Sequence, residues 1–99
     1  MIENINLINI DADKIEEIKL KLSDDILLNI ACNYDLVNDN IKLLKSYGID
    51  NIDELLINRP HIFLKDTNYL LNAFNDSDVE SIGYLVNNDY TEIDDILDI

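Results

Sequence analysis

A chain of 99 residues is long enough for one domain with a single modest core. Its 47% of hydrophobic residues excludes a disordered protein, and no apolar run approaches the roughly 20 residues of a membrane-spanning helix. Its net charge of −14 argues against direct binding of nucleic acid, because contacts with phosphates need Lys and Arg and the chain has only seven.

The charge is unevenly distributed along the chain. Residues 1–39 contain nine acidic residues and three lysines, and residues 40–65 contain three acidic and four basic residues, giving net charges of −6 and +1. Residues 66–99 contain nine acidic residues and no basic residue, a net charge of −9. An acidic binding surface is therefore expected in the last third of the chain.

The first ten residues, MIENINLINI, have two interpretations. Ile2, Ile5 and Ile8 would line one face of a helix, whereas Ile8 and Ile10 alternate with Asn9 as in a strand. We expect either a helix or a loosely held extended arm. The segment lacks the basic start of a signal peptide, and a lone cysteine excludes an internal disulfide, so a reducing cytoplasmic location is expected.

Two helices are predicted between residues 13 and 34. Asp13 followed by Glu16 has the pattern of a capping box, and Ser23 is a favoured cap for the second helix. The side chains expected in the core recur at helical spacing: Ile15, Ile18, Leu22, Leu27, Leu28, Ile30 and Ala31.

A third helix is predicted from Asp35 to Gly48, since glycine suits the left-handed turn that ends many helices. Asn51, with Glu54 three residues later, predicts the start of a fourth helix. Pro60 ends that helix and can begin a short turn. The side chains expected in the core of this part are Val37, Ile41, Leu44, Tyr47, Leu55 and Leu56.

Three further helices are predicted, over residues 66 or 67 to about 74, 77 to 87 or 88, and 92 to about 98. Ser77 followed by Glu80 has the capping-box pattern, and Thr91 is a favoured cap for the last helix. The local signals agree with one another. We therefore expect one all-α domain over residues 1–99, built as a small stack of six or seven short helices.

The segment 40–56 has a similar copy at 81–97, displaced by 41 residues. Ile41 corresponds to Ile82, and the acidic pair after Ile52 corresponds to the pair after Ile93. A third, partial copy starts at Ile15. The pattern predicts two to three degenerate helical repeats of about 41 residues. A generic stack of helix–turn–helix units would produce the same spacing.

The region around the first copy resembles the repeat of mitochondrial transcription terminator-like proteins. The resemblance covers about a quarter of the chain and depends on Leu44, Gly48-Ile49, Leu55-Leu56, Pro60 and Phe63. It implies a helical-repeat fold. That family binds DNA through basic faces, so its DNA-binding function is not expected in a chain this acidic.

No pattern in the chain predicts catalysis, a cofactor or a metal. The one histidine, His61, follows Pro60 at a helix break and is expected to be a packed or surface turn residue. Cys32 lies beside Ala31 on an apolar helix and is expected to be a small buried hydrophobic residue. The acidic run that starts at Asp76 begins like a calcium-binding EF-hand loop, but it lacks the glycine and the final glutamate of that motif.

The remaining feature is the acidic surface near the C-terminus. If Ile93, Ile96 and Leu97 face the core, the acidic residues between them face water, with Cβ atoms about 5–6 Å apart. Regularly spaced carboxylates can imitate the edge of nucleic acid, which has about one charge per 3.4 Å of each strand. A face that serves only solubility is the alternative. The residues expected to bind a partner are Asp76, Asp78, Glu80, Asp89, Glu92, Asp94, Asp95 and Asp98.

In size and acidity the chain is similar to phage-encoded inhibitors such as anti-CRISPR proteins. The resemblance implies a non-enzymatic nucleic-acid mimic that binds a basic surface of a protein partner in the bacterial cytoplasm, without contacting nucleic acid or membrane itself. The second hypothesis is a helical interaction or structural module that docks through an apolar edge. Salt separates the two, because it weakens a charge-driven complex far more than an apolar one.

Overall fold

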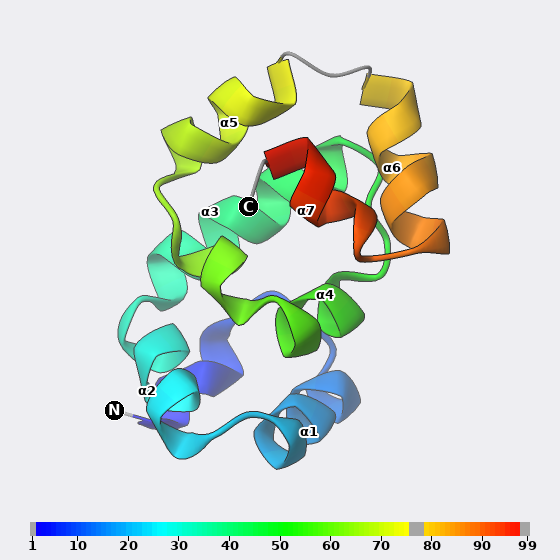
Figure 1. Cartoon of the computed structure of the whole chain (residues 1–99). Coiled ribbons are helices and arrows are strands. Elements are labelled where there is room, and N and C mark those ends of the chain that lie inside the picture. The colour runs from blue at the N-terminus through cyan, green and yellow to red at the C-terminus, as the bar shows by residue number, and fades with distance from the viewer. Residues whose placement is uncertain (1, 76–78, 98–99) are drawn as a thin grey trace.

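The structure is a computed structural model that describes residues 2–75 and 79–97. The fold is all-α, as the sequence predicts. Within these residues there are seven α-helices, two 3-10 helices and no strand (Figure 1). In chain order they are η1 (Ile2–Leu7), α1 (Ala12–Lys21), α2 (Asp24–Cys32), α3 (Tyr34–Ser46), α4 (Ile52–Asn58), η2 (Pro60–Leu64), α5 (Thr67–Asn75), α6 (Val79–Asn88) and α7 (Glu92–Leu97).

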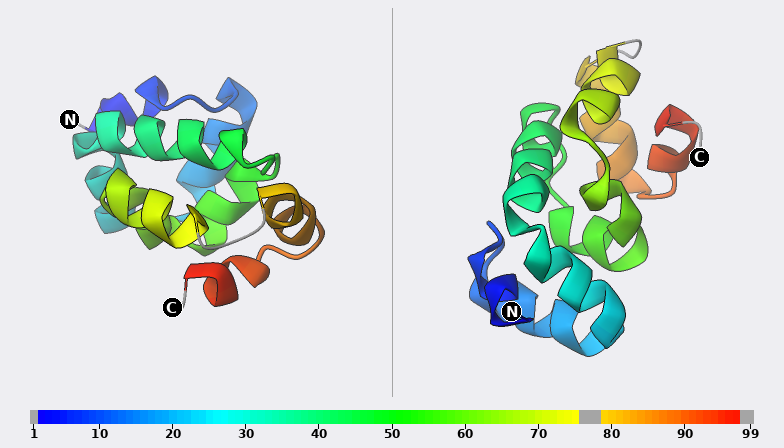
Figure 2. Two further views of the ribbon diagram at one scale, coloured as in Figure 1. Left: turned by 90° about the horizontal axis from the view of Figure 1, so that it is seen from above. Right: turned by 90° about the vertical axis from the view of Figure 1, so that its left-hand side faces the viewer.

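Helix α3 is the central element of the core. It packs against η1, α2, α4, η2 and α5, and its side chains Val37, Ile41 and Leu44 are fully buried or nearly so. Figure 2 shows η1, α1 and α2 gathered at one end of the molecule and α5, α6 and α7 at the other. The two ends therefore share one continuous core along α3.

The N-terminal segment is fastened to this core. Ile5 and Ile8 are buried, and η1 packs against α2. The side chain of Asn38 on α3 accepts the Asn9 N–H at 2.7 Å and donates to the Leu7 carbonyl at 3.0 Å. The segment is thus a short helix held from α3, and the expectation of a loosely held arm is wrong for residues 2–10.

Several predicted helix signals are displaced by one or two residues. Ser23 does cap α2, since its Oγ accepts the Ile26 N–H at 3.4 Å. Asp13 and Asp35 do not cap their helices. Each lies in the first turn, two residues after the N-cap, which is Asp11 in α1 and Asn33 in α3. A carboxylate in the first turn still interacts favourably with the helix dipole, which explains why both signals looked alike in the sequence.

One face of α2 is more open than its apolar sequence indicates. Leu28 is 43% exposed and Cys32 is also exposed, so the expectation that both are buried is wrong. The two residues are four positions apart and therefore lie on the same side of the helix. The opposite side, with Leu27 and Ile30, supplies the contacts with the core.

A buried asparagine joins α3 to the second half of the chain. Asn40 has no exposed surface, and its amide donates to the carbonyls of Phe63 at 2.9 Å and Lys65 at 2.8 Å. Its Oδ1 accepts the hydroxyl of Thr67 at 2.7 Å. These bonds satisfy backbone groups at the end of η2 and fix the start of α5 against α3.

Replacing Asn40 by alanine should destabilise the fold. The substitution leaves two carbonyls and a hydroxyl without a partner, and one unsatisfied buried polar group costs about 1–3 kcal/mol. We expect the free energy of unfolding in urea to fall by at least that amount. Asn29→Ala is the control, because this exposed residue of α2 should tolerate the change to within about 0.5 kcal/mol. Equal effects of the two substitutions would contradict the role assigned to Asn40.

Helix α6 crosses the α3–α4 turn at very close range. Gly48 in this turn has φ of +86°, which confirms its predicted role at the end of α3. A Cβ atom added at Gly83 would lie 2.7 Å from the Tyr47 carbonyl oxygen and 2.8 Å from that of Gly48. The absence of a side chain at Gly83 is therefore what lets α6 rest on the turn.

Asn87 fastens α6 to the same turn. Its Oδ1 accepts the backbone N–H groups of Asp50 at 2.8 Å and Asn51 at 3.4 Å, and its Nδ2 donates to the Gly48 carbonyl at 2.9 Å. In return, Asn51 donates from its side chain to the Val86 carbonyl at 3.0 Å. Asn51 precedes α4 as predicted, but its side chain holds α6 and makes no capping hydrogen bond.

Gly83→Ala should lower the melting temperature, although alanine is usually better than glycine in a helix by about 1 kcal/mol. The new methyl group would overlap the backbone of the α3–α4 turn, and forcing extra volume into a packed contact costs about 1–3 kcal/mol. Thermal unfolding followed by circular dichroism measures the sign of the change. A melting temperature above that of the wild type would show that α6 does not rest on the turn.

The two proposed repeat copies both form a pair of helices. The first copy spans the end of α3 and α4, and the second spans most of α6 and α7. Their turns are held differently, because Gly48 provides a left-handed residue in the first and Asp89 binds Thr91 in the second. The copies thus share their local structure, and a true repeat stays a prediction.

Candidate functional site

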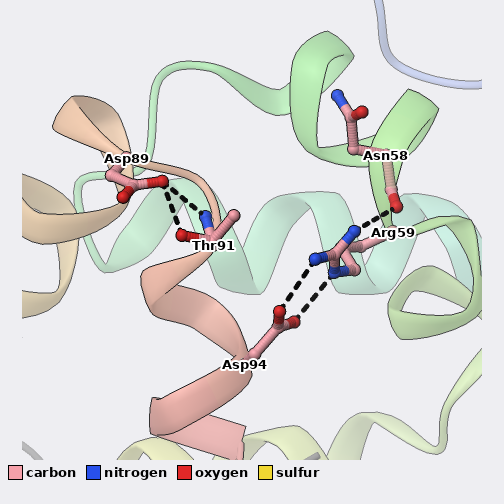
Figure 3. Close-up of polar contacts among 5 residues, drawn as sticks. All are labelled: Asn58, Arg59, Asp89, Thr91 and Asp94. Atoms are coloured by element: carbon pink, nitrogen blue, oxygen red, sulfur yellow. Dashed lines mark hydrogen bonds and ion pairs between the residues drawn. The ribbon is translucent and has the colours of Figure 1, made fainter.

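The acidic residues predicted to bind a partner fall into two groups. Asp76, Asp78 and Asp98 lie outside the described residues, as does the side chain of Glu80. The other four, Asp89, Glu92, Asp94 and Asp95, belong to the α6–α7 turn and to α7. Figure 3 shows that two of these four are engaged within the fold.

Asp89 holds the turn between α6 and α7. Its Oδ1 accepts the backbone N–H of Thr91 at 3.0 Å and the Thr91 hydroxyl at 2.7 Å (Figure 3). Hydrogen bonds to the charged form favour ionisation, so the Thr91 hydroxyl, and then its N–H, lower the pKa of Asp89. Asp89 is exposed, but its Oδ1 already shapes the turn that starts α7.

Asp94 forms a bidentate ion pair with Arg59, which lies 35 residues earlier. Arg59 Nε donates to Asp94 Oδ1 at 2.9 Å and Nη2 donates to Oδ2 at 2.8 Å (Figure 3). Both side chains are 27% exposed. The hydrogen bonds from Arg59, more than its charge, lower the pKa of Asp94. Asp94 is therefore only partly exposed, and both of its carboxylate oxygens are bound within the fold.

Arg59 is placed for this contact by two further neighbours, Asn58 and Tyr90. It follows the last residue of α4, where its Nη1 donates to the Asn58 carbonyl at 2.8 Å. Its guanidinium carbon lies 5.4 Å from the centre of the Tyr90 ring, a cation–π distance. The hydrogen bond with Asp94 raises the pKa of Arg59. Arg59 therefore attaches α7 to the α4–η2 junction.

Glu92 and Asp95 are the two predicted residues of α7 that stay free. Asp95 is exposed and Glu92 is half-buried, and the side chain of neither makes a hydrogen bond or ion pair with a described residue. They lie three positions apart in the first turn of α7, so they are neighbours on the helix surface. These two carboxylates are the part of the predicted site that the described structure leaves available to a partner.

The other described carboxylates are compensated unevenly. Three lysines form ion pairs in the N-terminal half: Lys14 with Asp53 at 3.5 Å, Lys19 with Glu16 at 3.1 Å and Lys21 with Glu17 at 3.0 Å. In the described part of 66–99 the corresponding pair is that of Asp94 with Arg59. Ten described carboxylates make no side-chain hydrogen bond or ion pair with described residues: Asp11, Asp13, Asp24, Asp25, Asp35, Asp39, Asp50, Glu54, Glu92 and Asp95.

Other kinds of site find little support in the described structure. His61 in η2 and Cys32 at the end of α2 are both exposed. Among the described residues, no three His, Cys, Asp or Glu side chains come close enough together to hold a metal ion. No helix in the described ranges has the length and apolar character needed to cross a membrane.

The sequence did not point to the role of Arg59. An ion pair across 35 residues depends on how α7 packs, and no local pattern encodes it. One signal was available: Arg59 is the only arginine in the chain, and arginine favours bidentate pairing with carboxylates.

The pair of Asp94 with Arg59 should make stability depend on pH. Because the pKa of Asp94 is lower in the folded chain than its ordinary value of 3.8, the unfolded chain binds more protons in acid. The stabilisation is complete above that value and is lost as the pH falls through the folded pKa. In Asp94→Asn the free energy of unfolding should be lower at neutral pH and should change less on acidification.

Asp95→Asn is the matched control for this experiment. It removes a neighbouring exposed carboxylate that makes no ion pair with a described residue, so the acid-dependent loss of stability should remain. Denaturant titrations between about pH 7 and pH 2.5 measure both variants against the wild type. If the free energy of unfolding of Asp94→Asn falls with decreasing pH as much as that of the wild type, the pair contributes nothing to stability.

Comparisons with protein-family models, with curated proteins and with solved structures found no match for this chain.

Proposed function

We propose that this chain is a non-enzymatic acidic protein that binds a basic surface of a protein partner. The preferred form of the proposal is an inhibitor that occupies a nucleic-acid-binding groove, in the manner of anti-CRISPR proteins and other nucleic-acid mimics. The observation that carries it is the charge of residues 66–99, which contain nine acidic residues and no base. In the described part of this segment one carboxylate, that of Asp94, is neutralised by an ion pair.

Such an excess of charge has a cost for the folded chain. Repulsion between like charges destabilises a compact state, and a partner with Lys and Arg would remove that repulsion on binding. The three lysine ion pairs described above show that this fold can neutralise its carboxylates. Glu92 and Asp95 have no such pair, like eight described carboxylates of residues 1–65, but they belong to the segment that contains no Lys or Arg, and this supports a surface that is completed by another molecule.

In the proposed mechanism, the carboxylates compete with nucleic acid for Lys and Arg side chains of the partner protein. Glu92 and Asp95 are displayed on α7, which Arg59 holds against the body of the protein. Carboxylates fixed in this way can occupy the positions of phosphates without the entropy cost of ordering a flexible tail. They would also speed association with a basic groove at low salt.

An apolar docking module is the second candidate function. It is favoured by the exposure of apolar side chains at the N-terminal end, where Leu7 is 51% exposed and Leu28 is 43% exposed. A complex formed through these residues would persist at high salt, whereas one formed through carboxylates would dissociate.

The test replaces Glu92 by Gln and Asp95 by Asn together. The immobilised chain is exposed to bacterial proteins that have been retained on heparin, which selects basic nucleic-acid-binding surfaces. A captured protein is then purified, and displacement of labelled duplex DNA from it is measured by fluorescence anisotropy. We expect displacement by the wild type at low salt, and the double variant to be weaker by tenfold or more, since mutating a charge pair that is desolvated in the complex costs about 2–5 kcal/mol.

Asp24→Asn with Asp25→Asn is the matched control. These residues also lie in the first turn of a helix, so both double variants lose two charges and the same favourable interaction with a helix dipole. The control should displace DNA nearly as well as the wild type. Equal loss in both variants would mean that only net charge matters, and no loss in either, with binding that resists salt, would favour the apolar module.

A further inference from the structure

Tyr84 is the most exposed aromatic residue of the described structure. It lies on α6 and is 72% exposed, whereas Ile82 and Val86 on the opposite side of this helix are buried. The described residues provide no hydrogen bond or ring contact to its side chain. Its position on the outer face is fixed, because Gly83 and Asn87 hold the inner face on the α3–α4 turn.

The other two tyrosines of residues 66–99 each have a cation over the ring. Lys65 Nζ lies 5.1 Å from the ring centre of Tyr69, and Arg59 Cζ lies 5.4 Å from that of Tyr90. Both cations come from residues 40–65, because 66–99 contains no Lys or Arg. A cation for Tyr84 would therefore have to come from a neighbouring segment or from another molecule, and no described segment supplies one.

The surroundings of Tyr84 favour a cationic partner. Asp89 follows five residues later, directly after the end of α6, and leads into the first turn of α7 with Glu92. Five residues correspond to about 7.5 Å along the helix axis and to a turn of about 140° around it, so Asp89 lies beyond the end of α6 and away from the Tyr84 face. An arginine that approaches the ring would be attracted by the net charge of residues 66–99, which contain nine acidic residues and no base.

We propose that Tyr84 is the anchor of the partner-binding surface, and that its ring stacks on an arginine of the partner protein. Arginine fits better than lysine, because its planar guanidinium stacks on aromatic faces and is more weakly hydrated. Tyrosine and arginine are also enriched among the residues that dominate binding energy at interfaces. This inference rests on the proposed function and specifies the chemistry that the partner presents.

The test uses a fluorescein-labelled nona-arginine peptide as the probe and measures its affinity by anisotropy. Tyr84→Ala should weaken binding about 3- to 30-fold, the range of a cation–π contact, whereas Tyr84→Phe should bind like the wild type because the ring is kept. Leu20→Ala is the control, since Leu20 is 87% exposed on α1 at the other end of the molecule and should contribute nothing. Nona-lysine should lose less affinity than nona-arginine when Tyr84 is replaced.

Failure of this inference differs from failure of the proposed function. If Tyr84→Ala binds nona-arginine as the wild type does, while Glu92→Gln with Asp95→Asn binds more weakly, the anchor is overturned and the acidic site stands. The proposed stacking of arginine on Tyr84 is also contradicted if Tyr84→Ala and Leu20→Ala lose the same affinity, or if Tyr84→Ala loses the same affinity for nona-arginine and nona-lysine. Melting curves verify that each variant is folded, which is expected because both side chains are exposed.

Discussion

The buried amide of Asn40 is the interaction on which the second half of the structure depends. Where η2 ends, the carbonyls of Phe63 and Lys65 face the core, and α3 supplies the donor for both. A hydrophobic residue at this position would leave these carbonyls unpaired in a medium where that is costly. The bond to Thr67 then sets the start of α5, so that Phe74 can reach Tyr47, with ring centres 4.8 Å apart.

The last two helices are attached to this core by polar contacts as well as by the buried side chains Ile82, Val86, Ile93 and Leu97. Asn87 binds the α3–α4 turn, and Asp94 binds Arg59 at the end of α4. Both contacts use side chains that sequence patterns treat as solvent-facing. This arrangement divides the acidic residues of the C-terminal segment into those that build the fold, such as Asp89 and Asp94, and those that the fold leaves free. The charge available to a partner is therefore smaller than the composition indicates, and its position is better defined.

The sequence predicted those features of the candidate site that depend on composition and missed those that depend on contacts between residues far apart in the chain. The sequence identified the acidic segment, because charge content is a property of composition alone. It placed Asp94 on the water-facing side of α7, because helical periodicity distinguishes polar from apolar positions and does not show which polar residue meets an arginine from elsewhere. Tyr84 was one of five similar tyrosines in the sequence, and only the packing of α6 through Gly83 showed that its ring points outward.

What the sequence by itself determined is the all-α class, the approximate extent of most helices, and the stops at Gly48 and Pro60. These depend on the backbone preferences of single residues and on neighbours within one helical turn, which the sequence displays directly. Only the tertiary structure decided that Asn40 is buried, that Cys32 is exposed, and that Arg59 neutralises Asp94. Each of these depends on which face of a helix meets another segment, and that is fixed by the packing of residues about 20 to 40 positions apart, where local spacing gives no signal.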